Sequence, residues 1–401
     1  MAPLLLIVLA VPAALLSIFV AYEVLFACAS IPSLLRGRAL APTGGPQTVR
    51  LAVIIPAHNE SKLIEATVRS LLDADYPAAL RDVIVIADNC TDDTAALARG
   101  AGALCHERHD EVERGKPYAL RWIIDRLDLD RYDGLIVIDA DTVVDKGFLS
   151  AMAAHLARGE VAVQGYFGVR NPDETWLTRL AVVPGTIKYR LHYPGKWAFR
   201  LSCPLAGNGM CFAVDLVRKY GWTAFSLTEN WEYYVQLALR GHVVAPAAEA
   251  VIWSQVARTL KLGETQRSRW MRGRIDTLRR YWRPLLGQGL SEPSLVKLDA
   301  LVEVARPSHS ILMSWTLMYM TLCGLARMGG LEGANVLLLV AGVILGAQVT
   351  QFLVALALER PPLRTWLALL MVPWYIVWKL AVSIKGLRAL SQRSWVKTVR
   401  N

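Results

Sequence analysis

Long uncharged apolar runs near both ends of the chain constrain its fold more than any other sequence feature. No charged side chain occurs within Met1–Tyr22, and two further uncharged stretches cover Pro307–Ala326 and Gly333–Leu358. Each run is long enough for a helix to cross the hydrocarbon core of a bilayer, which takes about 20 residues. A fourth stretch, Thr365–Ile384, is apolar but contains a proline and a lysine. With 54% hydrophobic residues, the chain is predicted to have one spanning helix within residues 1–35 and about three within residues 305–386.

The basic residues predict how the chain is oriented in the membrane. The first of them, Arg36 and Arg38, follow the first apolar run, whereas a signal peptide has basic residues before its apolar core. The positive-inside rule then places the amino terminus outside and the middle of the chain in the cytosol, as an integral protein of the inner (plasma) membrane. Three later spans would put the basic tail, residues 387–401, outside, although a positive tail favours the inside. The final apolar segment is therefore expected to be a third span, which we favour, or a segment in the membrane interface.

The net charge of +10 is concentrated next to the apolar segments, within residues 267–283 and 385–400. This placement favours membrane lipids with anionic headgroups and a diphosphate-bearing substrate over nucleic acid as partners. The six cysteines include no CxxC pair and no metal-ligand spacing, so they are expected to be reduced thiols.

The middle of the chain alternates short apolar bursts with helical stretches, and it begins after a Pro- and Gly-rich linker, Ala41–Gln47. This alternation predicts an α/β domain with a largely parallel sheet, helices on both faces, and ligands at the carboxyl ends of the strands. Strands are predicted at Leu51–Ile55, Asp82–Ala87 and Leu135–Ile138, and helices at about residues 62–72 and 93–100.

Acidic residues follow each of these strands. Asp139 and Asp141 are separated by one residue at the end of the third strand, so both carboxylates could reach one Mg²⁺ or Mn²⁺. Such a cation would neutralise the charge of a diphosphate leaving group. The alternative is a polar turn after a buried strand. The position of this pair in a series of acid-bearing strand ends favours the metal.

Two further groups near the strand ends are candidates for binding a nucleoside diphosphate. Asp88, which follows the second strand, could accept hydrogen bonds from a nucleobase and from ribose hydroxyls, while Thr91 or Asp92 caps the next helix. Lys116 lies at the start of another predicted helix, so its cation could meet a diphosphate there. A solvated basic turn explains Lys116 equally well.

Six short motifs follow one another along the middle of the chain. They are Pro56–Glu60 (PAHNE), Ala87–Thr94, Asp139–Asp141 (DAD), Gly207–Gly209 (GNG), Leu227–Glu232 and Gln266–Trp270 (QRSRW). In these motifs and their order the chain resembles the membrane-integrated branch of the family 2 glycosyltransferases, which includes cellulose, hyaluronan, chitin and poly-N-acetylglucosamine synthases. The resemblance covers about residues 50–285 and the flanking apolar segments.

The resemblance implies a GT-A fold over residues 46–255 and inversion at the anomeric carbon of a UDP-sugar donor. It also implies roles for individual residues of this chain. They are Pro56, Glu60 and Asp88 for uridine, Asp141 for the metal with Asp139 close to the diphosphate, and Gly207 and Asn208 for the acceptor.

The last motif can also be argued from helix geometry. Gln266, Arg269 and Trp270 are spaced i, i+3, i+4, so a helix places them on one face. There Arg269 would neutralise phosphate, Trp270 would stack on a sugar ring, and Gln266 would hydrogen-bond hydroxyls. An amphipathic helix at the membrane surface is the alternative, and both can hold. Interfacial helices are accordingly expected within residues 174–200 and 256–300.

One position departs from the family pattern. Thr228-Glu229-Asn230 stands where the family usually has Thr-Glu-Asp, and that Asp is the expected general base. An amide cannot take a proton at neutral pH, so Glu229 or Glu232 substitutes, or the register differs, or the enzyme is impaired. Glu229 directly adjoins the base position and is favoured over Glu232, with Asn230 orienting the acceptor.

The resemblance and the residues together predict a metal-dependent glycosyltransferase that extends a β-linked polysaccharide or oligosaccharide at the cytosolic membrane face. Its acceptor is a glycan or is lipid-linked, and secretion proteins are expected as partners. A single transfer to a membrane lipid and a non-catalytic assembly subunit are the alternatives. A polymer ladder would distinguish the first activity from the second, which gives one glycolipid.

Overall fold

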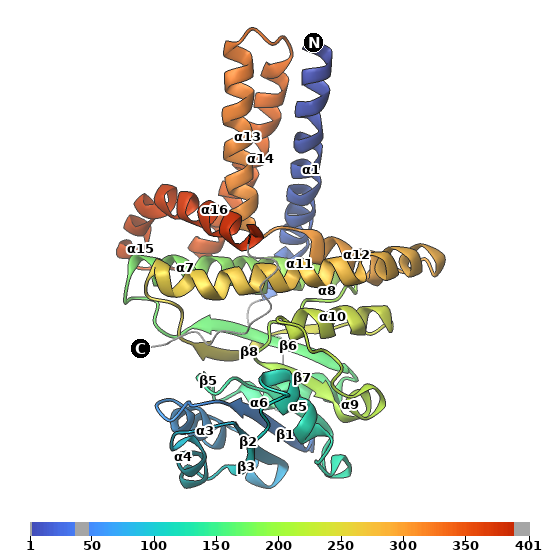
Figure 1. Cartoon of the computed structure of the whole chain (residues 1–401), viewed down its shortest axis with the longest axis vertical. Coiled ribbons are helices and arrows are strands. Elements are labelled where there is room, and N and C mark those ends of the chain that lie inside the picture. Colours follow the sequence, from blue (N-terminus) through green and yellow to red (C-terminus); the bar gives the residue numbers. More distant parts are fainter. Residues whose placement is uncertain (1, 37–47, 389–401) are drawn as a thin grey trace.

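The computed structural model describes residues 2–36 and 48–388, so the predicted linker Ala41–Gln47 and the tail beyond residue 388 lie outside the described residues. The described chain has three parts, which Figure 1 shows stacked along the long axis. An α/β domain lies at one end, a layer of helices lies across it, and a group of long helices stands upright on this layer.

The α/β domain is built on one eight-stranded sheet. Its strands are β1 (Leu51–Ala57), β2 (Arg81–Asp88), β3 (Leu104–Arg108), β4 (Gly134–Val137), β5 (Thr142–Val144), β6 (Ala162–Val169), β7 (Met210–Ala213) and β8 (Ala245–Ser254). The strand order is β3-β2-β1-β4-β7-β6-β8-β5, and the first four strands pair in parallel as predicted. The carboxyl ends of β1, β2 and β4 therefore meet at one edge.

The prediction of a largely parallel sheet is wrong for the other half. There β7 runs antiparallel to both β4 and β6, and β5 runs antiparallel to β8, whereas β6 and β8 are parallel. β5 has only three residues, and an apolar pattern that identifies a strand does not report the direction in which the strand runs.

Helices cover both faces of the sheet and bury its apolar side chains. They are α3 (Ile64–Leu72), α4 (Thr94–Gly100), α5 (Lys116–Ile124), α6 (Phe148–Ala157), α9 (Val214–Tyr220) and α10 (Glu229–Leu239), with short turns η1 (Ala78–Leu80) and η2 (Leu129–Arg131). Along β1, Ala52 and Ile54 pack with residues of α5 and α10, whereas Val53 and Ile55 pack with residues of α3 and α6. Burial of a side chain such as Ile54 contributes about 1.5–3 kcal/mol, so the apolar run of β1 fixes this strand in the centre.

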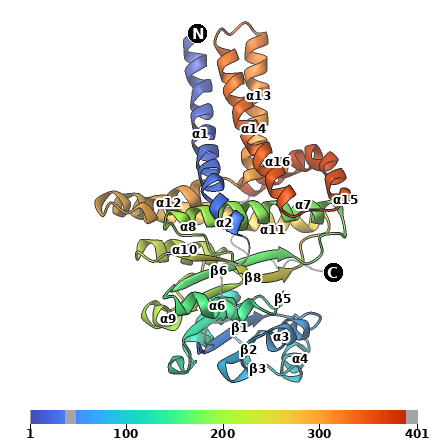
Figure 2. The ribbon, with the colours of Figure 1, turned by 180° about the vertical axis from the view of Figure 1, so that it is seen from behind.

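A layer of helices separates the domain from the upright helices. It consists of α7 (Trp176–Thr186), the π-helical segment η3 (Ile187–His192), α8 (Tyr193–Ala198), α11 (Leu260–Ser291) and α12 (Leu295–Ala305). Figures 1 and 2 show these elements running crosswise to the upright helices. Helices thus form within both ranges that were predicted to be interfacial.

Three long apolar helices stand upright in both views: α1 (Ala2–Ala29), followed by the short α2 (Ile31–Arg36), α13 (His309–Met328) and α14 (Ala334–Leu358). They share an apolar core that includes Leu16, Leu312 and Ile344. Four segments of the described chain are long and apolar enough to cross a membrane, and the fourth is Leu363–Val382. That fourth segment is broken into α15 (Leu363–Leu367), the turn η4 (Ala368–Met371) and α16 (Val372–Arg388).

Candidate active site

The loops that follow β1 and β2 are joined by the side chain of Asn59. Asn59 and Asn89 both adopt left-handed backbone conformations, with φ of 54° and 50°. Asparagine tolerates this region better than most residues, because its short side chain bonds locally. Oδ1 of Asn59 accepts a hydrogen bond from the backbone N–H of Thr91 at 2.7 Å, which ties the first loop to the second. The loops that carry Glu60 and Asp88 are therefore fixed relative to each other.

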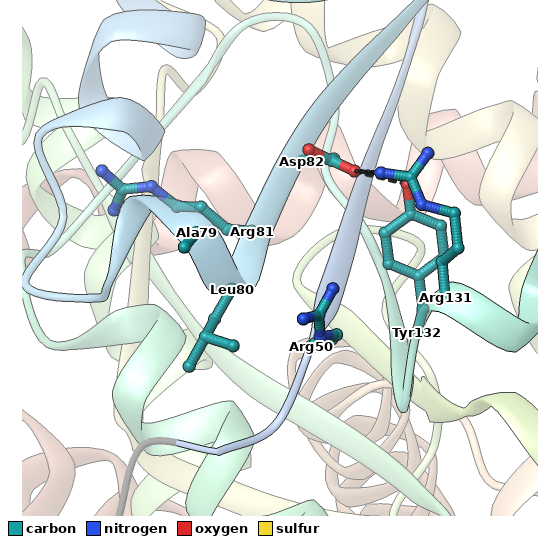
Figure 3. Close-up of a pocket in the computed structure, with 7 residues that line it drawn as sticks. All are labelled: Arg50, Ala79, Leu80, Arg81, Asp82, Arg131 and Tyr132. Carbon is teal, nitrogen blue, oxygen red and sulfur yellow. Dashed lines mark hydrogen bonds and ion pairs between the residues drawn. The ribbon is translucent and has the colours of Figure 1, made fainter.

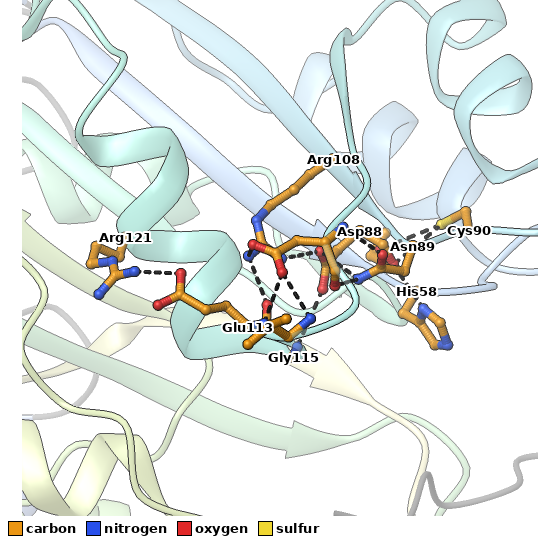
Figure 4. A network of polar contacts seen from close by, with 11 residues as sticks. His58, Asp88, Asn89, Cys90, Arg108, Glu113, Gly115 and Arg121 are labelled. Atoms are coloured by element: carbon orange, nitrogen blue, oxygen red, sulfur yellow. Dashed lines mark hydrogen bonds and ion pairs between the residues drawn. The ribbon is translucent and has the colours of Figure 1, made fainter.

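Asp88 lies in a buried polar network at the end of β2 (Figure 4). Its Oδ1 pairs with Nη1 of Arg108 at 2.6 Å, and its Oδ2 accepts from the N–H of Gly115 at 3.3 Å. Arg108 also donates to the carboxylate of Asp110 at 2.9 Å and to the carbonyl of Glu113 at 2.6 Å. The carboxylate of Asp88 thus anchors the loop that leads to Lys116. No local sequence pattern points to Arg108, which ends β3 and lies twenty residues after Asp88 in the chain.

Breaking this pair should destabilise the domain. Both side chains are almost fully buried, so Arg108→Ala leaves an uncompensated carboxylate and should lower the free energy of unfolding by about 3–5 kcal/mol. The control is Arg99→Ala, which breaks an exposed pair with Glu107 and should cost at most about 1 kcal/mol. Thermal unfolding of the two purified variants tests this, and equal shifts would contradict it.

Lys116 brings three distant parts of the chain together. Its Nζ lies 2.5 Å from Oδ1 of Asp139, donates to the carbonyl of Gly207, and lies 3.9 Å from Oε1 of Glu229. The side chain of Lys116 is only 22% exposed, so this is not a solvated basic turn. One cation therefore stands between two carboxylates at the edge where the strands end.

Glu229 begins α10 and points toward this cation. Its side chain is 14% exposed. Burial raises the pKa of its carboxyl above the usual value; Asp139 acts in the same direction, while Lys116 and Arg269 oppose the shift. A buried carboxylate with a raised pKa next to a cation has the properties expected of a general base.

The other two predicted catalytic residues face different partners. Nδ2 of Asn230 donates to the carbonyl of Leu205 at 2.6 Å, and a Cβ on Gly207 would lie 3.5 Å from the Asn230 side chain. Oε2 of Glu232 accepts hydrogen bonds from the backbone N–H groups of Phe225 and Ser226 at 2.9 and 2.8 Å. Glu232 thus braces the loop before α10, while Asn230 lies beside the loop that contains Gly207.

Asp139 and Asp141 are held by the neighbouring Gly-Asn-Gly loop. The N–H of Asp139 donates to Oδ1 of Asn208 at 3.0 Å, and Nδ2 of Asn208 donates to Thr142 at 2.7 Å. Thr142 in turn donates to Oδ1 of Asp141 at 3.3 Å. Asn208, predicted to lie on the acceptor side, is 3% exposed and orients the two acids.

The acids at this edge suit a cation that shares its coordination with substrate. Within residues 2–36 and 48–388 no group of three or more His, Cys, Asp or Glu side chains could hold a metal by itself. Mg²⁺ is commonly bound by one or two carboxylates together with phosphate oxygens and water. Asp139 and Asp141 provide two such carboxylates, and the side chain of Asp139 is 36% exposed.

α11 passes close above α10 and brings the last motif to the same place. A Cβ on Gly273 would overlap the side chain of Thr228, so only glycine permits this approach. Arg269 lies one helical turn before Gly273, and its charge acts on the carboxyl of Glu229. Gln266 and Trp270 also lie in α11, as predicted for this motif, and the side chain of Trp270 is 49% exposed.

The glycine contact gives a test with a matched control on the same helix. Gly273→Ala should push α11 away from α10 and lower turnover by about 10-fold to 100-fold, because a displacement near 1 Å misplaces Arg269. A Cβ on Gly287 meets nothing within 4 Å, so Gly287→Ala should leave turnover unchanged. Steady-state kinetics of both variants decide between a positioning role and a neutral one.

A small hollow at the opposite end of the strands is a separate feature (Figure 3). It has a volume of about 40 Å³ and lies beside Arg50, Asp82 and Arg131. Asp82 accepts a hydrogen bond from Tyr132 at 2.5 Å and lies 3.6 Å from Arg131. The hollow is at the amino ends of β1 and β2, away from the acids at the carboxyl ends.

The fold and these acids define a GT-A glycosyltransferase. Residues 46–273 match the profile of the glycosyltransferase like family 2, and the chain belongs to this family. It is 26% identical over 237 residues to the probable glycosyltransferase YdaM of Bacillus subtilis, covering 56% of this chain and 55% of that protein. It is 25% identical over 259 residues to the poly-beta-1,6-N-acetyl-D-glucosamine synthase of Staphylococcus epidermidis, covering 61% of this chain and 60% of that protein.

A solved structure with a similar fold is the mannosyltransferase PcManGT from Pyrobaculum calidifontis, in complex with GDP-Man and Mn²⁺. The two structures superpose with a TM-score of 0.51 and 16% sequence identity. The match covers 86% of this chain and 99% of the mannosyltransferase. The predicted family and the GT-A fold with flanking apolar helices are thus confirmed.

Proposed function

We propose that this protein transfers a sugar from a UDP-sugar to an acceptor hydroxyl with inversion at the anomeric carbon. The observation that carries the proposal is the contact of Lys116 with Asp139 and Glu229 beneath α11. Glu229 takes the proton of the acceptor hydroxyl, because it is the buried carboxylate with a raised pKa. Lys116 and Arg269 offset the negative charge of the diphosphate, which leaves with the nucleoside.

The donor side of the site is assigned to the loops after β1 and β2. Pro56, Glu60 and Asp88 contact the uridine, with Asp88 sharing its carboxylate between the nucleoside and Arg108. Asp139 and Asp141 would hold Mg²⁺ or Mn²⁺, which would neutralise the charge of the diphosphate. The mannosyltransferase PcManGT, which has a similar fold, was solved with GDP-Man and Mn²⁺, and this supports the assignment.

The acceptor is placed at the face of α11 that carries Gln266 and Trp270. Relatives named poly-beta-1,6-N-acetyl-D-glucosamine synthases support extension of a β-linked glycan, although the chain spans about 60% of the length of such a relative. The second candidate is a single transfer to a membrane lipid. It is favoured by α1, α13 and α14, whose described residues pack against one another around an apolar core. Export of a polymer would then require a partner protein.

The two candidates give different products. Purified protein in lipid nanodiscs is incubated with a panel of radiolabelled nucleotide sugars and a membrane lipid extract, and the products are sized. A ladder supports glycan extension, and a single chloroform-soluble product supports transfer to lipid. Label that never leaves any nucleotide sugar would instead point to a non-catalytic assembly subunit.

A further inference from the structure

The last apolar segment of the chain begins at the level of the crosswise helices. It follows α14, which ends at Leu358. Arg360, with a φ of 47°, and the two prolines after it prevent the helix from continuing and turn the chain. Glu359 lies 3.3 Å from Nη1 of Arg190 in η3 and accepts from the hydroxyl of Thr186 at 2.8 Å. These contacts fix the beginning of the segment beside α7 and η3.

The other end of the segment returns to the same level. The guanidinium of Arg267 in α11 lies over the rings of Tyr375 and Trp378, at 5.3 and 5.0 Å from their centroids. Nζ of Lys379 donates to the hydroxyl of Ser310, the second residue of α13. The ring of Tyr375 also meets Trp176 of α7 edge-on, with centroids 6.5 Å apart.

These two anchor points exclude a spanning helix. A straight helix between Glu359 and Lys379 would carry its ends about 30 Å apart, across the whole hydrocarbon core. Here both ends touch helices of the crosswise layer. Figures 1 and 2 agree, because α15 and α16 lie beside α7 and α11 rather than along α13 and α14.

The surface of this segment that faces away from the protein is apolar. Its exposed side chains recur at the spacing of one helical face, whereas Thr365, Ala368 and Val382 are buried against the protein. Arg360 and Arg364, both exposed, flank its start and suit anionic headgroups. The exposed apolar residues, here called the α15–α16 stripe, are Leu363 (74%), Leu367 (58%), Leu370 (79%), Trp374 (59%) and Val377 (62%).

We propose that α15 and α16 lie in the plane of the membrane, with the α15–α16 stripe inserted in the leaflet that faces the glycosyltransferase domain. The partner is the lipid leaflet itself, because the stripe adjoins the base of α13, whose outer face is exposed and apolar at Trp315 and Met318. The chain then crosses the membrane three times, through α1, α13 and α14. The end of α16 then lies on the side of the domain, which is the side that the positive-inside rule favours for the basic residues that follow it.

The position of the tail is tested by thiol labelling of the full-length protein in intact cells. A cysteine added after Asn401 should react with a membrane-impermeant maleimide only after permeabilisation. Glu332→Cys, in the exposed turn between α13 and α14, should react before it, and the wild-type chain gives the baseline. Reaction of the added cysteine in intact cells would overturn the proposal. This test is independent of catalysis, so it can fail while the proposed function stands.

The depth of the stripe provides a second, separate measurement. Leu363, Leu370 or Val377 is replaced in turn by an environment-sensitive fluorescent amino acid, in nanodiscs with lipids spin-labelled near the headgroup or deep in the acyl chain. An in-plane segment predicts the same shallow quenching at all three positions. A spanning helix predicts depths that differ by about 21 Å between the first and last position. Fluorophores shielded from water but quenched by neither lipid would show that a protein covers the stripe, and would also overturn the proposal.

Discussion

Glu229→Gln is expected to lower turnover by about 10²-fold to 10⁴-fold while donor binding changes less than threefold. The amide keeps the shape of the side chain and its place beside Lys116, but it cannot accept the proton of the acceptor hydroxyl. Initial rates at saturating donor measure the first effect, and equilibrium titration with UDP measures the second. Loss of UDP binding in parallel with turnover would assign Glu229 to the donor site instead.

The pH dependence of turnover gives an independent view of the same group. A base works only when deprotonated, so turnover should fall as the pH drops through the pKa of Glu229. Burial raises that pKa, so the fall should occur at higher pH than for an exposed glutamate. Lys116→Met removes the cation that most opposes the shift, and the fall should then move to still higher pH.

Substitutions of Glu232 and Asn230 test whether Glu229, rather than one of these neighbours, is the general base. Glu232→Gln should keep most of the turnover, because Glu232 accepts hydrogen bonds from the amides of Phe225 and Ser226 rather than facing Lys116. Asn230→Asp should change turnover only modestly if Glu229 is the base. If neither glutamine substitution slows transfer and Asn230→Asp accelerates it strongly, the wild-type chain is an impaired enzyme and the assembly-subunit hypothesis gains.

The parts of this site that the sequence predicted are those with a strong local pattern. The apolar runs of β1, β2 and β4 identify buried strands, and acids after them must gather where parallel strands end. The spacing of Gln266, Arg269 and Trp270 identifies one helix face, and α11 is helical throughout that stretch. Such features depend on a few consecutive residues, so one sequence is enough to find them.

The parts that escaped depend on contacts between residues far apart in the chain. Glu303 of α12 contacts Lys196 at 3.1 Å, His192 at 2.8 Å and Arg306 at 2.9 Å in the buried junction below the upright helices. Arg306 also pairs with Glu23 of α1, 283 residues away. No periodicity links such positions. The course of α15 and α16 could not be predicted for the same reason. Hydropathy does not distinguish a spanning segment from one that packs against α11, where Arg267 lies over the ring of Tyr375.

Asp141→Asn is expected to lower turnover by at least about 10²-fold, with no loss of thermal stability. Among the described residues no third His, Cys, Asp or Glu side chain completes a metal site with Asp139 and Asp141. The carboxamide removes one of two negative ligands, so charge neutralisation of the diphosphate weakens by several kcal/mol. Excess chelator should abolish transfer by the wild-type protein, and Mg²⁺ or Mn²⁺ should restore it.

The matched control for this metal prediction is Asp75→Asn, which changes an exposed carboxylate of the same domain and should leave turnover and cation dependence unaltered. The variant Asp141→Asn should also need a higher Mn²⁺ concentration for half-maximal turnover, because the remaining ligand binds the ion more weakly. Full activity in excess chelator would contradict the metal assignment. In that case the charge of the diphosphate must be offset by Lys116 and Arg269, which lie close enough to Glu229 to act on its carboxyl.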